Sequence, residues 1–225
     1  MTVRRPAGRR VLAIDVGGTH VKMLVKGAGA RRKFDSGPEM TAARMVRGVK
    51  QAARGWTYDC VAMGYPGPVV SGRPLHEPAN LGGGWVRFDF SKAFGCPVKI
   101  MNDAAMQALG SYRGGRMLFL GLGTGLGSAM VVDGIVEPME LAHLPYDNGK
   151  TYEDYLGKRG LEDLGKKKWR KRVADVVEKL SAALEPDDIV IGGGNAAKLK
   201  TLPEGTRRGS NANAFRGGFR MWAGT

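Results

Sequence analysis

The sequence is poor in cysteine, in acidic residues and in long apolar runs, and each shortage excludes a class of protein. Cys60 and Cys96 are the two cysteines among 225 residues, which is too few for a disulfide framework or a cysteine-based zinc site. The chain lacks the run of about 18 apolar residues that a membrane-spanning helix needs. The apolar stretch after the basic N-terminus stops at Asp15, too early for the core of a signal peptide. These absences predict a reduced, cytoplasmic protein without a membrane partner.

Acidic residues are outnumbered by basic ones, 21 to 35, so the chain carries a formal charge of +14 at pH 7. This excess fits a polyanionic partner, and it fits solubility alone equally well. The basic residues gather in the N-terminal arm, in 166–172 and in the tail after residue 206. The sequence shows no zinc finger, RNP motif or helix-turn-helix signature, so nucleic acid is the minor alternative.

The arrangement of apolar residues and turn residues predicts a chain that alternates between strands and helices. Short apolar runs predict buried strands, and helical spacing of apolar residues predicts helices. The principal strands are expected at 11–16, 21–26, 60–64, 98–101, 117–120, 128–132 and 189–191, and the helices at 39–54, 103–112 and 169–184. The segment 65–84 is expected to be a long loop, which in a compact domain is usually functional. The tail from residue 206 is expected to be only half ordered.

Two glycine-rich turns stand in corresponding places in the two halves of the chain. Gly17-Gly18-Thr19 and Gly123-Thr124-Gly125 each follow a predicted strand and lead into another strand. A duplicated two-lobe fold would show this echo, with the halves meeting near residue 115, although glycine-rich hairpins also recur by chance. Glycine lets backbone N–H groups approach an anion, so both turns are candidate phosphate sites. The second turn is no dinucleotide fingerprint because a strand follows it, and the chain has no Walker A lysine.

Several polar side chains stand where strands end. Asp15 is a candidate ligand of Mg²⁺, directly or through water, or a turn-forming aspartate. Asn102-Asp103 follows a strand and begins a helix, so Asp103 is either a helix cap or a general base for a hydroxyl nucleophile. Glu140 and His143 have the spacing of one turn and suit the hydroxyl groups of a sugar. For His143 alone, a surface histidine is the simpler interpretation.

Seven short motifs between residues 11 and 200 resemble, in order, those of the ROK-family sugar kinases, and among these most closely the polyphosphate glucokinases. They occupy residues 15–19, 64–67, 79–81, 101–104, 122–129, 140–143 and 191–194.

The resemblance implies an α/β, actin-like or hexokinase-type (ribonuclease H-like) duplicated two-lobe fold with a central cleft. We expect a basic N-terminal arm at 1–10, an N-terminal α/β lobe at 11–114 and a C-terminal α/β lobe at 115–225. The implied reaction is phosphoryl transfer from polyphosphate or ATP, with Mg²⁺, to the 6-hydroxyl of glucose or a related hexose. Because family members are commonly dimers, a homodimer is an expected assembly.

The resemblance also assigns roles by position. Asp103 would be the general base. Asp15 would help to place Mg²⁺, either directly or through a water molecule. The implied substrate-binding residues are Asn80, Asn102, Glu140, His143, Glu153 and Gly67. The implied phosphate-binding residues are Gly17, Gly18, Thr19, Lys22, Gly123, Thr124, Gly125, Gly193 and Gly194. Lys22 is equally well interpreted as an exposed strand lysine.

The chain departs from the family pattern in two places. Many ROK kinases carry a cysteine-rich zinc loop after the histidine motif, whereas 144–150 contains no cysteine, so no structural zinc is predicted. Ala142 stands where the family has glycine, which is expected to alter sugar preference. The +14 charge and the basic run 166–172 favour polyphosphate over ATP as donor.

Three other functions are kept as alternatives. They are a ROK-like kinase for another hexose or an amino sugar, a non-catalytic sugar-sensing protein, and a polyanion-binding protein. The sensing function is disfavoured because only ten residues precede the first expected strand, too few for a helix-turn-helix.

Overall fold

A computed structural model describes residues 9–223 of the chain. The chain divides into two compact units, Met1–Asp103 with Gly218–Thr225, and Ala104–Gly217. This division lies closer to the N-terminus than the expected one at residues 114 and 115, because α3 (Asp103–Ser111) packs with the second unit and the last residues return to the first. Most of the basic arm expected at 1–10 lies outside the described residues.

The first unit is built on a five-stranded sheet in the order β3-β2-β1-β4-β7. Strands β3, β2 and β1 pair antiparallel, whereas β1, β4 and β7 run parallel. The strands are β1 (Val11–Val16), β2 (His20–Val25), β3 (Arg32–Asp35), β4 (Cys60–Tyr65) and β7 (Val98–Asn102), and the helices are α1 (Ala42–Ala52) and α2 (Phe90–Phe94).

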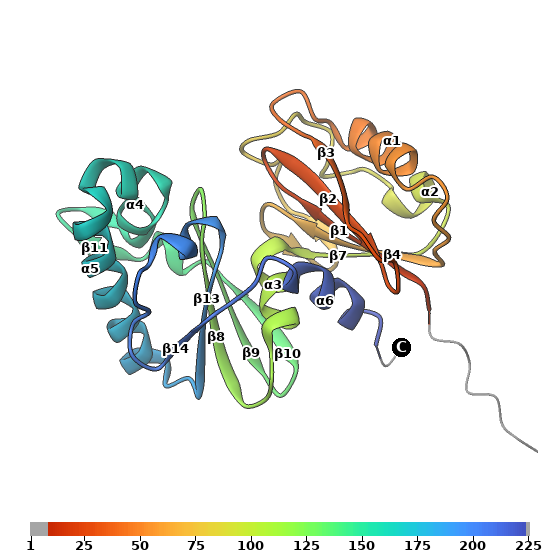
Figure 1. Cartoon of the computed structure of the whole chain (residues 1–225). Helices are drawn as coiled ribbons and strands as arrows, with labels where there is room; N and C mark the ends of the chain where they lie inside the picture. The colour runs from red at the N-terminus through yellow and green to blue at the C-terminus, as the bar shows by residue number, and fades with distance from the viewer. Residues whose placement is uncertain (1–8, 224–225) are drawn as a thin grey trace, which may run out of the picture. The chain divides into compact units, whose positions relative to one another are not determined.

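The second unit repeats this topology in the order β10-β9-β8-β13-β14, again with three antiparallel strands followed by parallel ones (Figure 1). Its strands are β8 (Arg116–Leu122), β9 (Leu126–Val132), β10 (Ile135–Met139), β13 (Asp188–Gly192) and β14 (Thr206–Arg208). The echo between the two glycine turns is therefore confirmed as a repeat of a whole sheet. This mixed α/β architecture is the expected duplicated fold.

Strand β1 is buried along its whole length because both faces of the first sheet are covered. Leu12, Ile14 and Val16 pack in one cluster with the apolar faces of α1 and α2. On the other face, Val11 packs with Trp222. A strand buried on both faces is expected to be continuously apolar, which explains why 11–16 was readable from sequence.

The core of the second unit forms between its sheet and the long helix α5 (Lys158–Leu184). Trp169, Val173 and Val176 project from α5 onto Leu118 and Leu120 of β8. The residue Gly165 has a left-handed φ of 68°, so α5 is two helical segments joined at a kink. The sequence predicted the second segment and missed the first, along with the short α4 (Tyr152–Leu156) before it.

The remaining elements are short. The expected loop at 65–84 contains a small hairpin of β5 (Val69–Val70) and β6 (Arg73–Pro74). A second hairpin joins β11 (Pro145–Asp147) to β12 (Lys150–Thr151). Two further elements are 3₁₀ turns, η1 (Leu141–His143) and η2 (Gly194–Lys198). Within residues 9–223, no helix is long and apolar enough to cross a membrane.

The tail is more ordered than its composition suggested. It forms β14, which pairs with β13, and α6 (Asn213–Arg220). A Cβ added to Gly110 of α3 would overlap the Asn213 carbonyl, and one added to Gly217 would overlap the Met106 carbonyl. Helices α3 and α6 therefore cross, and each contributes one glycine to the contact. The sequence alone could not show this, because a glycine-rich composition is equally typical of a disordered tail.

Candidate active site

The predicted residues of the first unit follow the carboxyl ends of its parallel strands. Asp15 of β1 pairs with Gly64 of β4, which in turn pairs with Met101 of β7. The three strands thus end at the same edge of the sheet, where ligands of open α/β sheets bind. The turn Gly17–Thr19 and residue Asp103 both leave the sheet at this edge.

Asp15 is a largely buried carboxyl group. Its side chain is 12% exposed, and the Lys22 Nζ lies 3.4 Å from its Oδ2 from the directly opposite position on β2. Burial raises the pKa of Asp15, and the neighbouring Lys22 ammonium partly opposes that rise. Lys22 therefore forms an ion pair with Asp15, and its ammonium group is held beside that carboxyl group.

The first glycine turn lies against the loop that carries Asn80. A Cβ placed on Gly18 would lie 3.3 Å from the Asn80 Cβ, so the two backbones approach closely. The predicted sugar residue and the predicted phosphate turn are thus neighbours. A side chain at Gly18 would need the Asn80 loop to give way.

Asn102 is held at the end of β7 by a bond to the Gly67 loop. The Asn102 Nδ2 donates to the Gly67 carbonyl at 3.2 Å. Tyr65, in the register position opposite Asn102, donates from its hydroxyl to the His76 carbonyl at 2.7 Å. Burial raises the pKa of Tyr65, which keeps this donor protonated. Gly67 and Asn102, predicted separately from two motifs, are brought together.

Glu77 is a functional candidate that sequence reasoning missed. Its carboxylate accepts hydrogen bonds from the backbone N–H groups of Trp85 and Val86, at 3.0–3.3 Å. These bonds close the loop that presents Asn80. The Trp85 side chain is fully buried beneath the loop and donates to the Gly82 carbonyl. A glutamate eight residues before a tryptophan carries no recognisable signal.

Asp103 occupies the point at which the chain passes from the first unit to the second. It follows the last residue of β7, and it begins α3. The next residue, Ala104, packs in the second unit, where its Cβ would lie 2.7 Å from a Cβ added to Gly127. Asp103 is therefore one peptide bond from a residue that contacts the strand after the second glycine turn.

The second unit places its glycines at the corresponding edge of its own sheet. Gly121 of β8 pairs with Gly192 of β13, so the Gly123–Gly125 turn and Gly193 emerge side by side. Gly193 has a φ of 83°, and an added Cβ would overlap the Leu122 carbonyl, so only glycine fits there. Gly194 has open space around it.

Glu153 braces the second glycine turn. Its Oε2 accepts from the Leu126 backbone N–H at 3.0 Å, and a Cβ on Gly125 would overlap that same oxygen. The described contacts of Glu153 thus lie on the predicted phosphate turn. Its implied role in sugar binding stays a prediction.

Glu140 precedes the 3₁₀ turn η1, which follows β10, and His143 is the last residue of that turn. The Glu140 Oε2 and the His143 Nε2 lie 3.7 Å apart, and both side chains are exposed. The Ser128 hydroxyl holds the turn by donating to the Met139 carbonyl at 2.7 Å and accepting from the Leu141 N–H at 3.2 Å. Both side chains are therefore available to one ligand, as their spacing predicted.

Metal binding by the protein alone has little support in the described part of the chain. Residues 9–223 contain no group of three or more His, Cys, Asp or Glu side chains placed to hold a metal ion. Asp15 offers a single carboxylate beside the first glycine turn. One carboxylate suits Mg²⁺ that arrives with a substrate's phosphates, because that ion keeps most of its ligands from water and phosphate.

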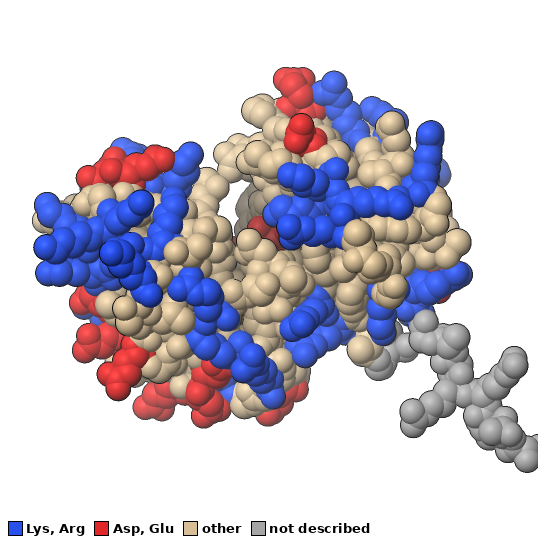
Figure 2. Space-filling view, viewed as in Figure 1, with Lys and Arg blue, Asp and Glu red and all other residues tan. Residues whose placement is uncertain are grey.

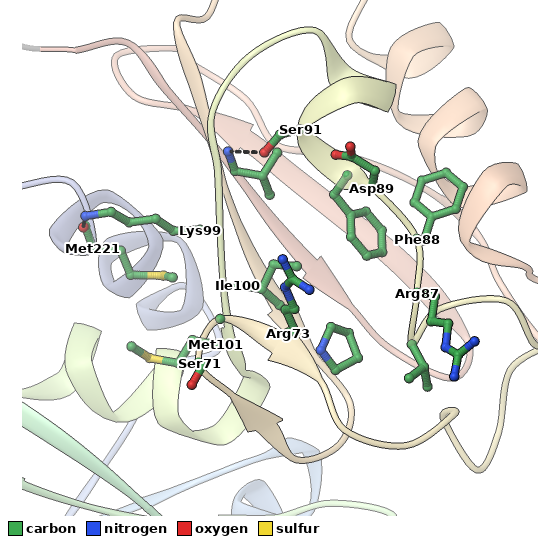
Figure 3. A pocket seen from close by; sticks show the side chains of 15 residues that line it. Ser71, Arg73, Arg87, Phe88, Asp89, Ser91, Lys99, Ile100, Met101 and Met221 are labelled. Carbon is green, nitrogen blue, oxygen red and sulfur yellow. Dashed lines mark hydrogen bonds between the residues drawn. The ribbon is translucent and has the colours of Figure 1, made fainter.

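The first unit also contains a hollow of about 830 Å³. It follows the outer edge of β7 and is lined by the β5–β6 hairpin, by 86–91 and by Met221 (Figure 3). At its border, the Lys99 Nζ donates to the Met221 carbonyl at 2.8 Å. None of the predicted site residues lines this hollow, but Met101, the chain neighbour of Asn102, does.

The family of the chain follows from a match to a family model. Residues 11–137 match the model described as ROK family. The chain belongs to the ROK family. The matched segment contains the first unit's sheet and the second glycine turn.

Known relatives and solved structures agree with this membership. A polyphosphate glucokinase from Mycobacterium tuberculosis is 27% identical over 212 residues, covering 84% of this chain and 79% of that protein. The crystal structure of the inorganic polyphosphate/ATP-glucomannokinase from Arthrobacter sp. strain KM superposes with a TM-score of 0.77, at 23% identity, over 96% of this chain and 99% of that one. A ROK family transcriptional regulator, a homolog of the E. coli MLC protein, superposes with a TM-score of 0.74, at 17% identity, over 94% of this chain and 77% of that one. The fold is thus the actin-like, hexokinase-type fold of ROK proteins.

Proposed function

We propose that this ROK-family chain is a cytoplasmic sugar kinase that transfers a phosphoryl group from polyphosphate or ATP to the 6-hydroxyl of glucose. The observation that carries the proposal is the position of Asp103. It leaves the first sheet at the edge that carries Asp15 and the first glycine turn, and its chain neighbour Ala104 packs on Gly127 beside the second turn. Relatives named as polyphosphate glucokinases support the same reaction class.

In this proposal Asp103 is the general base. Its carboxylate accepts the proton of the 6-hydroxyl as that oxygen attacks the terminal phosphorus of the donor. The bond from that phosphorus to the bridging oxygen breaks, and ADP or the shortened polyphosphate leaves. Positioned general bases contribute roughly 10²- to 10⁴-fold to rate. Phosphoryl transfer otherwise depends on alignment and on neutralising charge at the phosphates.

Sugar hydroxyls are assigned to polar side chains from several elements. The Asn102 amide is oriented by its bond to Gly67, and its carbonyl oxygen would accept from a sugar hydroxyl. Asn80, on the loop that Glu77 closes, offers a second amide. Glu140 and His143, 3.7 Å apart, supply an acceptor and an imidazole that donates or accepts. A set of fixed donors and acceptors rejects sugars that lack the matching hydroxyls.

The donor's phosphates are assigned to the glycine turns and to Thr19 and Thr124. Backbone N–H groups in such turns bind phosphate oxygens without a competing side chain. Asp15 would hold Mg²⁺ through water, and the ion would supply neutralisation of phosphate charge. Lys22, fixed 3.4 Å from Asp15, would place a further positive charge beside these phosphates.

The test is glucose phosphorylation, measured with ATP and with polyphosphate in the presence of Mg²⁺. The variant Asp103→Asn should lower kcat about 10³-fold and leave the Kd of glucose within a few-fold. Asp35→Asn is the matched control, because Asp35 is an exposed aspartate on β3, and it should leave kcat unchanged. Full turnover by Asp103→Asn would refute the mechanism. Glucose binding by the wild-type chain without turnover on either donor would instead indicate a sugar-sensing protein.

A further inference from the structure

Helix α5 begins beside the second glycine turn and runs into a strongly basic segment. The Lys158 backbone N–H donates to the Thr124 carbonyl at 3.0 Å, which ties the start of α5 to the turn. After the kink at Gly165, six of the seven residues 166–172 are Lys or Arg. The segment therefore presents a dense positive charge in the same unit as the turn.

Burial of Trp169 fixes which way this charge faces. The indole is fully buried, and its Nε1 donates to the Leu156 carbonyl at 3.0 Å. The flanking lysines are consequently exposed. Figure 2 shows Lys and Arg side chains gathered where Figure 1 labels α5. The basic side chains of this segment form what we call the α5 basic surface: Lys166, Lys167, Lys168, Arg170 and Lys171.

The 3₁₀ turn η2 connects the α5 basic surface to the glycine turn by a second route. The Asn195 Nδ2 donates to the Gly123 carbonyl at 2.8 Å, at the start of η2. The Arg170 Nε donates to the Lys198 carbonyl at 2.7 Å, at its end. One short element thus contacts the phosphate turn and the α5 basic surface, and Lys198 adds to the charge between them.

The lysines of the α5 basic surface have no acidic partner among the described residues, unlike the cations around them. Lys158 pairs with Glu162, Arg159 with Asp163, and Arg172 with Asp147, whereas no ion pair involves 166–168 or Lys171. Positive charge in the first turn of a helix segment opposes the helix dipole. The cluster therefore costs folding stability, which an anionic ligand would offset.

We propose that the α5 basic surface binds the distal phosphates of a polyphosphate donor whose terminal phosphate lies at the Gly123–Gly125 turn. This rests on the proposed function and deepens it. From Lys158 to Leu164, the residue before the kink, the helix rises about 9 Å, and the α5 basic surface begins two residues later. A long polyphosphate spans that distance, whereas the phosphate chain of ATP ends at its nucleoside after three phosphates. Single-stranded nucleic acid is less suited, because its bases need exposed aromatic side chains for stacking and Trp169 is buried.

The test compares donors in the double variant Lys167→Ala/Lys171→Ala. Both lysines are exposed on one helix face and alanine favours the helix, so folding should be kept. We expect the KM for long-chain polyphosphate to rise about tenfold, with a shallower dependence on salt. The KM values for ATP and tripolyphosphate, and kcat on ATP, should stay unchanged.

The matched control is Arg113→Ala/Lys179→Ala, which removes the same charge from the second unit. Lys179 is twelve residues beyond Lys167, about 18 Å along α5, and Arg113 precedes the start of β8, at the opposite end of that strand from the turn. The control should leave the KM for long polyphosphate unchanged. An equal loss in both variants, or equal effects on ATP and polyphosphate in the first, would overturn the proposal.

Direct binding separates this proposal from the kinase assignment. If the wild-type chain phosphorylates no sugar, the proposed function fails. The surface is then tested by measuring binding of long-chain polyphosphate and of a single-stranded RNA at physiological salt. Polyphosphate binding that weakens about tenfold in Lys167→Ala/Lys171→Ala supports the surface. No binding, or tighter binding of the RNA, overturns it.

Discussion

The packing of Gly125 against Glu153 leads to a quantitative prediction for the second glycine turn. The three nearest atoms to a Cβ added at Gly125 all belong to the Glu153 carboxylate. Gly125 is absent from the residues with positive φ, so the backbone itself accepts alanine. The variant Gly125→Ala should therefore act by displacing Glu153 from the Leu126 N–H. A hydrogen bond to a charged acceptor contributes about 1.5 kcal/mol at the lower end of its range, which suits a half-buried carboxylate.

A double-mutant cycle measures this coupling. Gly125→Ala and Glu153→Ala should each lower the free energy of unfolding by about 1.5 kcal/mol. In the Glu153→Ala background the clash is gone, so Gly125→Ala should be neutral or stabilise by about 0.5 kcal/mol through the unfolded state. The free energies come from urea denaturation of the four proteins. Glu153→Gln, which keeps an acceptor oxygen, is the control and should cost less than Glu153→Ala. Additive losses in the double variant would refute the reasoning.

Three further predictions concern stability and substrate binding. Because burial raises the pKa of Asp15, its carboxyl favours the folded state below the unfolded pKa of about 3.9 and loses that contribution as pH rises through the folded pKa. Asp15→Asn should thus raise Tm at pH 7, with a gain that shrinks toward pH 4; an unchanged or lower Tm at pH 7 would contradict this. Gly217→Ala should lower the free energy of unfolding, measured in urea, by about 3 kcal/mol, because the added Cβ meets the Met106 carbonyl. A loss below 1 kcal/mol would contradict the close crossing of α3 and α6. Glu77→Ala should lower the free energy of unfolding by about 2 kcal/mol and raise the KM for glucose. An unchanged KM would show that the loop closed by Glu77 does not take part in sugar binding.

The parts of the fold that sequence predicted are those fixed by local pattern. Strand β1 is apolar except for Asp15 because it is buried on both faces, and the turns after β1 and β8 are marked by glycine and threonine. Both signals depend on neighbours along the chain. The repeated sheet order then follows from two copies of one pattern.

The parts that sequence missed depend on residues distant along the chain. Sequence reasoning missed Glu77, whose bond to the Trp85 N–H reaches eight residues along the chain. It predicted Glu153 as a sugar ligand but not the bond of Glu153 to the Leu126 N–H, 27 residues away, because no spacing rule connects such pairs. The order of the tail depends on Gly217 meeting α3. Gly165, which divides α5, is one glycine among 35 in the chain, and nothing in its neighbouring residues marks it as the one with a positive φ.

The chain passes between its two units at two places, and both adjoin the crossing of α3 and α6. One passage follows Asp103, three residues before Met106, and the other follows Gly217, whose backbone rests on Met106. Both covalent connections thus leave the second half from one pair of touching helices. Any bulk added at that contact would act on the incoming and outgoing segments together.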